Sequence, residues 1–263
     1  MSNSKRKTML TRREFMRLSA AAAAGVAFLP QLSCSSTAIP APLKRPFGRI
    51  NFNVTTLGLG GQASIQWTPE GVDPVAIIKK AFDLGVNYFD TSNVYGPSQL
   101  NYGKAFRELN LIPGQKGYNQ SLRESIFLTN KTMIRWAKGG YPRIENVRNS
   151  TNGDHAGGAV EDLKRTLSQI FGNDDGTYPE GSYVNMMLIH NITNPEEVDV
   201  VYKGLETPLD VNDNFGALVA LRDYRDGTNI TGLNPKNEKL IRHIGFSGHY
   251  SAPVMIDMIQ RDK

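Results

Sequence analysis

The sequence predicts an α/β protein built on a parallel β-sheet. Apolar, β-branched runs alternate five times with segments that have helical spacing of apolar residues. These runs are apolar along their whole length, as expected for strands that are covered on both faces. Hydrophobic residues make up 40% of the 263 residues and charged residues 21%, which excludes a disordered or collagen-like chain. A doubly wound sheet and a β/α barrel both satisfy this pattern.

The first half of the predicted domain contains three strands and two helices. The run 54–59 is rich in β-branched residues and ends in glycines, which is typical of a strand. Asp73 is a favourable N-cap and Pro74 fits the first helical position, so a helix is expected from there to Gly85. The remaining elements expected in this half are a strand at 86–90, a helix at 99–109 and a strand at 126–131.

The second half continues the same alternation. In the segment 159–171, apolar residues at positions 160, 163, 167 and 170 have the spacing of one helix face. The other expected elements are strands at 184–190 and 243–246, a helix at 215–224 and a helix that begins at 253.

Residues 1–38 are predicted to be an export signal. A basic tract precedes an alanine-rich apolar tract at 19–29, and small residues follow up to Ala38. The Arg12-Arg13 pair directly before the apolar tract resembles the twin-arginine signal of bacteria. A general secretory signal is the alternative. We therefore expect a periplasmic or cell-envelope protein, with the twin-arginine translocon as its partner during export.

Cys34 is a candidate lipid anchor, because it stands where a bacterial lipoprotein carries its modified cysteine; cleavage after Ala38 is the alternative. As the single cysteine of the chain, it excludes a disulfide framework and a cysteine-held metal site, and we predict no metal site. We expect a Pro-rich linker at 39–46 and one domain at 47–263.

The net charge of +5 gives no reason to propose a nucleic-acid partner. Residues 1–38 carry six basic side chains and one acidic side chain, and the rest of the chain carries 24 of each. The predicted domain is therefore neutral, without the excess of basic residues that is typical of phosphate-backbone binding.

A glycine-rich turn at 58–63 fits the pattern G-x-G-x-x-A of dinucleotide-binding proteins. That pattern binds a pyrophosphate only where a helix begins at the glycines. Here Trp67 and Pro69 intervene, and the capped helix begins only at Asp73. We interpret the turn as a tight strand end, with a Rossmann dehydrogenase as the alternative.

Four polar residues stand at or just after the ends of predicted strands: Asp90, Tyr95, Lys131 and His190. Each alone has an ordinary structural explanation, such as a capped turn or a solvated lysine. Because the carboxyl ends of parallel strands lie on one rim of the sheet, we expect the four side chains to converge there.

These positions fall in motifs that resemble the aldo-keto reductase family. The segment 85–98, GVNYFDTSNVYGPS, is similar to the signature of that family. The segments FLTNK at 127–131, MLIH at 187–190 and RHIGFS at 242–247 resemble its later strands. The matches run in family order from about residue 47 to the last residue.

The resemblance implies a (β/α)₈ TIM barrel that reduces an aldehyde or ketone with hydride from a nicotinamide cofactor, NADP by family default and NAD as the alternative. It implies that Tyr95 is the proton donor and that Lys131 lowers its pKa. It further implies that Asp90 pairs with Lys131 and that His190 orients the small-molecule carbonyl substrate. Its implied cofactor-binding residues are Ser247, Gly60 and Gly61.

About five of the eight strand–helix units of such a barrel are accounted for in this sequence. We therefore expect a partial barrel, a chain that is C-terminally incomplete, and weak activity. The alternative is a non-catalytic exported half-barrel that serves in binding or structure.

Overall fold

Five parallel strands form the central sheet of the computed structural model, which describes residues 40–134, 136–137, 158–205, 208–249 and 251–261. The strands are β3 (Leu59–Gly60), β4 (Tyr88–Asp90), β5 (Phe127–Thr132), β6 (Val184–Ile189) and β7 (Ile241–Phe246). Their order in the sheet follows their order in the sequence, and every neighbouring pair is parallel. The predicted α/β class is confirmed.

The strand order distinguishes between the two predicted architectures. A doubly wound sheet reverses its strand order at a switch point, whereas a β/α barrel adds each strand beside the previous one. Among the described strands the order β3-β4-β5-β6-β7 has no reversal. The structure is therefore part of a barrel, and the Rossmann alternative is wrong.

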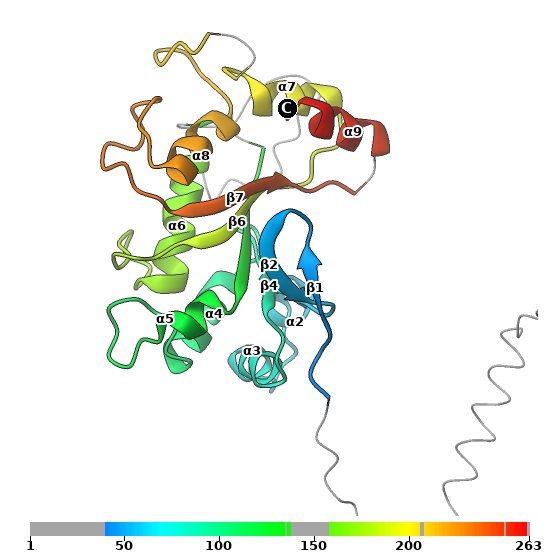
Figure 1. Cartoon of the computed structure of the whole chain (residues 1–263), viewed down its shortest axis with the longest axis vertical. Helices are drawn as coiled ribbons and strands as arrows, with labels where there is room; N and C mark the ends of the chain where they lie inside the picture. Colours follow the sequence, from blue (N-terminus) through cyan, green and yellow to red (C-terminus); the bar gives the residue numbers. More distant parts are fainter. Residues whose placement is uncertain (1–39, 135, 138–157, 206–207, 250, 262–263) are drawn as a thin grey trace, which may run out of the picture. The chain divides into compact units, whose positions relative to one another are not determined.

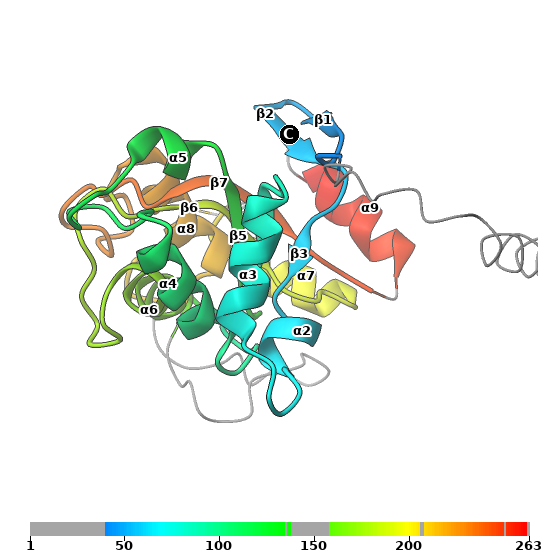
Figure 2. The same cartoon turned by 90° about the horizontal axis from the view of Figure 1, so that it is seen from below.

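The helices follow the strands in turn, and most of them lie along one face of the sheet (Figure 2). They are α2 (Ala63–Gln66), α3 (Pro74–Asp83), α4 (Ser98–Glu108), α5 (Gln120–Glu124), α6 (Ala159–Phe171), α7 (Pro195–Tyr202), α8 (Ala217–Asp226) and α9 (Ala252–Arg261). Helix α3 contacts α4, α4 contacts α6 and α6 contacts α8, so these four form one row. Right-handed crossovers that all advance in the same direction produce such a row.

The predicted start of α3 and the predicted apolar face of α6 are seen in the structure. The Asp73 carboxylate accepts a hydrogen bond from the backbone N–H of Val75, at 2.9 Å, and Pro74 occupies the first turn of α3. In α6 the apolar residues Leu163, Leu167 and Ile170 are fully buried, as their spacing predicts. This apolar stripe packs α6 against the sheet.

A β-hairpin precedes the sheet and corrects two predictions. Strand β1 (Lys44–Phe47) pairs antiparallel with β2 (Ile50–Thr55), and Gly48 in the turn has φ +56°. The predicted linker 39–46 is therefore partly a strand. The predicted strand 54–59 is two strands, because its first residues belong to the hairpin and Leu59 begins β3.

The hairpin covers the amino ends of the strands. The rings of Phe47 and Phe52 lie 5.2 and 5.3 Å from that of Phe127 at the start of β5. The Asn87 side chain accepts a hydrogen bond from the Thr55 N–H at 2.7 Å, which ties the hairpin to the start of β4. In Figure 1 the hairpin lies on the opposite side of β6 and β7 from α6 and α8. The hairpin therefore packs against the amino ends of β4 and β5.

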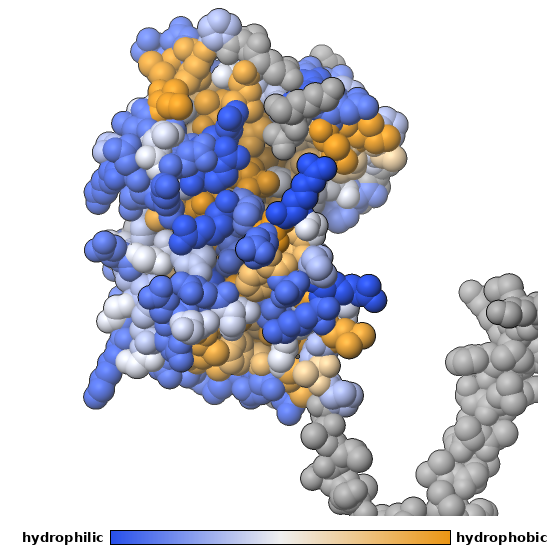
Figure 3. Space-filling model, in the orientation of Figure 1, coloured by the Kyte–Doolittle hydropathy of each residue, from blue (hydrophilic) through white to orange (hydrophobic). Residues whose placement is uncertain are grey.

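The predicted export signal, with Arg12, Arg13 and Cys34, lies outside the described residues. Within the described ranges, no helix combines the length and the apolar character that a membrane crossing requires. Apolar surface does occur over α9 (Figure 3), where the side chains of Ile256 and Ile259 are exposed.

Candidate active site

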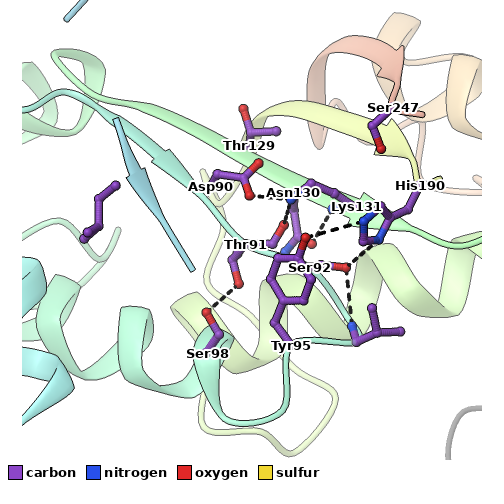
Figure 4. Close-up of polar contacts among 12 residues, drawn as sticks. Asp90, Thr91, Ser92, Tyr95, Ser98, Thr129, Asn130, Lys131, His190 and Ser247 are labelled. Carbon is purple, nitrogen blue, oxygen red and sulfur yellow. Dashed lines mark hydrogen bonds and ion pairs between the residues drawn. The ribbon is translucent and has the colours of Figure 1, made fainter. Parts of the chain in front are cut away.

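The structure brings the four predicted residues together at the carboxyl ends of the strands (Figure 4). Asp90 is the last residue of β4, Lys131 lies near the end of β5, and His190 directly follows β6. Tyr95 lies in the loop between β4 and α4. The parallel register places these strand ends on one rim, as the alternating sequence pattern predicts.

Lys131 and Asp90 form a buried ion pair. The Nζ atom of Lys131 contacts the Asp90 carboxylate and also donates to the backbone carbonyl of Thr91 at 2.9 Å. The Lys131 side chain is 7% exposed and that of Asp90 23%. Burial lowers the pKa of the ammonium and raises the pKa of the carboxyl, while their mutual attraction opposes both shifts.

Tyr95 lies beside this pair and is 8% exposed. The Lys131 Nζ atom lies 4.7 Å from the centroid of its ring. Burial, with a smaller contribution from the Asp90 carboxylate, raises the pKa of Tyr95 to about 12. The pKa lowering expected from Lys131 is therefore not seen in this structure, because burial and the Asp90 carboxylate both raise the pKa of the phenol.

His190 meets Tyr95 and a residue that the sequence analysis missed. Its Nε2 atom lies 3.4 Å from the Tyr95 hydroxyl, and its Nδ1 atom lies 3.3 Å from the hydroxyl of Ser92. Ser92 is completely buried, two residues after Asp90. A serine in a loop gives no sequence signal of such a contact, although its place inside the 85–98 motif could have drawn attention to it.

Ser247 lies directly after β7, at the same end of the sheet as the four residues. Its hydroxyl oxygen accepts a hydrogen bond from the Asn191 N–H at 3.1 Å, which leaves its own proton available to a further acceptor. Its backbone N–H donates to the Ile189 carbonyl at 2.9 Å, so β6 holds Ser247 in place.

The two candidate glycines differ in their surroundings. A Cβ on Gly61 would lie 2.5 Å from the Asp90 carbonyl oxygen and 2.5 Å from the Ser98 hydroxyl, so close packing requires glycine there. Gly60 has open space, with nothing within 4 Å of such an atom. It lines a hollow of about 440 Å³ that Asp90 and Tyr88 also border. The interpretation as a tight strand end thus fits Gly61, whereas Gly60 faces the hollow.

The one-turn helix α2 follows these glycines and was not predicted. It has four residues and no side-chain N-cap.

Across the described part of the chain, no group of three or more His, Cys, Asp or Glu side chains could hold a metal ion. The site itself brings together a phenol, an imidazole and a buried ion pair.

Known proteins are similar to this chain in sequence and in structure. Over 82 residues, covering 30% of this chain and 22% of that protein, the chain is 38% identical to D-arabinose 1-dehydrogenase of Saccharomyces cerevisiae. A Bombyx mori aldo-keto reductase in complex with NADP is a structural neighbour at 17% identity and a TM-score of 0.47, with 86% of this chain and 56% of that chain covered. A Klebsiella pneumoniae aldo/keto reductase in complex with NADP and acetate is a second structural neighbour, at 15% identity and a TM-score of 0.46. The match covers 81% of this chain and 52% of that chain.

The chain thus spans little more than half the length of these two solved proteins and about a fifth of the yeast enzyme. The model of the aldo/keto reductase family matches residues 56–259, which include all four residues of the site. Because this match takes in more than three quarters of the sequence, the chain belongs to the aldo/keto reductase family.

Proposed function

We propose that this site reduces an aldehyde or ketone to an alcohol, with hydride from NADP in its reduced form and a proton from Tyr95. One observation carries the proposal: the Tyr95 hydroxyl and the His190 Nε2 atom converge at 3.4 Å beside the buried Asp90–Lys131 pair. Two polar groups that aim at one point, next to a buried charge, suit a carbonyl oxygen that gains negative charge during reaction. Family membership supports the same chemistry.

The residues of the rim fit a nicotinamide cofactor. Ser247 keeps a hydroxyl proton for an amide carbonyl, and Gly60 leaves open space beside Asp90. These two residues would hold the cofactor at this end of the sheet. When bound, the cofactor supplies the hydride that no protein side chain can provide. The two solved relatives bind NADP, which favours that cofactor here.

The raised pKa of Tyr95 defines its role. With a pKa of about 12 the phenol stays protonated at neutral pH and can donate a hydrogen bond to the carbonyl oxygen. As that oxygen becomes an alkoxide, it becomes a stronger base than a phenolate and takes the proton. The nearby Lys131 ammonium stabilises the phenolate that results, and Asp90 fixes the ammonium in place. His190 orients the carbonyl oxygen of the substrate.

The proposal is tested by mixing NADPH with a panel of aldehydes and ketones and measuring both NADPH loss and alcohol formed. We expect one alcohol per NADPH. The variant Lys131→Met should lose at least about 100-fold in rate, as expected for disabled general acid catalysis. Lys79→Met is the matched control, because Lys79 pairs with Glu108 at the surface, and it should retain the rate. Equal rates in both variants would contradict the proposal.

We also propose that residues 1–38 direct export through the twin-arginine translocon. The motivation is the Arg12-Arg13 pair before the apolar tract. Changing both arginines to lysine should keep the protein in the cytoplasm, because lysine lacks the planar guanidinium group. The control variant changes both Arg6 and Arg17 to lysine, which removes the same number of guanidinium groups but keeps the Arg12-Arg13 pair. Unchanged export of the Arg12/Arg13 variant would indicate the general secretory route.

A further inference from the structure

Ser92 lies in the loop after β4 and is completely buried beside His190, which follows β6. Its hydroxyl oxygen has two neighbours, the His190 Nδ1 atom at 3.3 Å and the backbone N–H of Val94 at 3.4 Å (Figure 4). Neither Asp90 nor Lys131 shares these contacts, so the Ser92 side chain meets the four site residues through His190. The Ser92 backbone carbonyl separately accepts a hydrogen bond from the Tyr95 N–H at 3.1 Å.

The chemistry of these two neighbours determines where the protons lie. A backbone N–H can only donate, so the Ser92 oxygen accepts from Val94. The single proton of the hydroxyl then needs an acceptor, because a buried hydroxyl without one is unfavourable. Of the atoms that contact this hydroxyl among the described residues, His190 Nδ1 alone can accept. A neutral imidazole that accepts at Nδ1 carries its proton at Nε2.

We infer that Ser92 is a positioning residue that holds His190 in the tautomer with the proton on Nε2. This proton then faces the Tyr95 hydroxyl oxygen, 3.4 Å away. The backbone of His190 is fixed independently, since its N–H donates to the Thr132 carbonyl at 2.8 Å. Ser92 therefore acts on the proton and the ring, and the strand end acts on the backbone.

The tautomer decides which way the Tyr95 proton points. With a proton on Nε2, His190 donates to the Tyr95 oxygen, and the phenol proton remains available to a carbonyl oxygen. With the proton on Nδ1, Nε2 would be an acceptor and would take up the phenol proton in a hydrogen bond. Ser92 thus prevents His190 from competing with the substrate; this catalytic consequence rests on the proposed function.

The tautomer can be measured without any ligand. The protein with ¹⁵N-labelled histidine is studied by NMR, and the signal of His190 is assigned among the four histidines by its loss in His190→Gln. We expect Nε2–H in the wild type, a mixture of tautomers in Ser92→Ala and Nε2–H again in Ser92→Thr. Ser168→Ala is the control, because Ser168 is a buried serine that also accepts a backbone N–H, from Gly176 at 2.9 Å, on the distant helix α6.

Two results would overturn the inference: Nδ1–H in the wild type, or an unchanged tautomer in a folded Ser92→Ala variant.

Turnover is a second, separate measurement. Loss of one neutral hydrogen bond should lower kcat in Ser92→Ala by about fivefold with little change in the KM of the carbonyl. Ser92→Thr should restore kcat, and Ser168→Ala should not change it. A tautomer shift in a protein that reduces no carbonyl would support the positioning role and refute the proposed function.

Discussion

The rings of Tyr95 and His190 cross edge to face at 83°, with the phenol oxygen 3.4 Å from Nε2. The two residues are 95 positions apart in the sequence and come from the loop after β4 and the end of β6. Their meeting depends on the parallel register of β4, β5 and β6, which sets the strand ends side by side. The relationship therefore links the sheet topology directly to the chemistry proposed for the rim.

The Asp90–Lys131 pair should also stabilise the fold cooperatively. Removing one partner leaves a buried charge uncompensated, so Asp90→Asn or Lys131→Met should each lower the free energy of unfolding by about 3 kcal/mol. The double variant should cost clearly less than the sum of the two, because no unpaired charge remains. Urea unfolding of the four proteins measures this coupling. Additive losses would show that the two charges do not depend on each other.

The raised pKa of Tyr95 predicts a pH dependence of stability. The folded-state pKa is about 12 and that of an unfolded tyrosine is about 10. This difference contributes stability that is fully present below about pH 10 and is lost as the pH rises through about 12. The free energy of unfolding should therefore fall more steeply over this range in the wild type than in Tyr95→Phe. Parallel curves for the two proteins would mean that Tyr95 titrates normally.

The two glycines after β3 should respond differently to substitution. Gly61→Ala forces a Cβ against the Asp90 carbonyl and the Ser98 hydroxyl and should cost about 1–3 kcal/mol of stability. Gly60→Ala meets no atom within 4 Å and should change stability by no more than about 0.5 kcal/mol. Thermal unfolding of both variants measures the contrast. A larger loss for Gly60→Ala would contradict the packing described here.

Much of the fold could be predicted from the sequence, because each strand is an apolar run and the helices show either a cap or an apolar face. The Asp73-Pro74 cap and the buried stripe of α6 are examples. The hairpin was missed because its strands form a separate two-stranded sheet and depend on contacts with Phe127, far along the chain. Helix α7 was also missed, although Asn194 caps it and Pro195 opens it, which is a readable signal.

The site was predictable as a set of residues but not as a set of protonation states. Asp90, Tyr95, Lys131 and His190 all lie at or shortly after the ends of strands, and parallel topology is enough to bring them together. The pKa of Tyr95 depends on how deeply the ring is buried, and the partner of His190 Nδ1 depends on a loop conformation. Residue spacing predicts neither the burial of a ring nor the conformation of a loop. The role of Ser92 and the raised pKa of Tyr95 therefore follow only from the structure.

The proton-donating role of Tyr95 is tested most directly by comparing the wild type with Tyr95→Phe, which removes one oxygen and keeps the ring. The measurement is the single-turnover rate of carbonyl reduction at saturating NADPH, with NADPH binding titrated in both proteins. We predict unchanged NADPH affinity and a rate that is at least about 100-fold lower in Tyr95→Phe, the loss expected when a general acid is removed. A Tyr95→Phe protein that reduces the carbonyl as fast as the wild type would show that the proton comes from elsewhere.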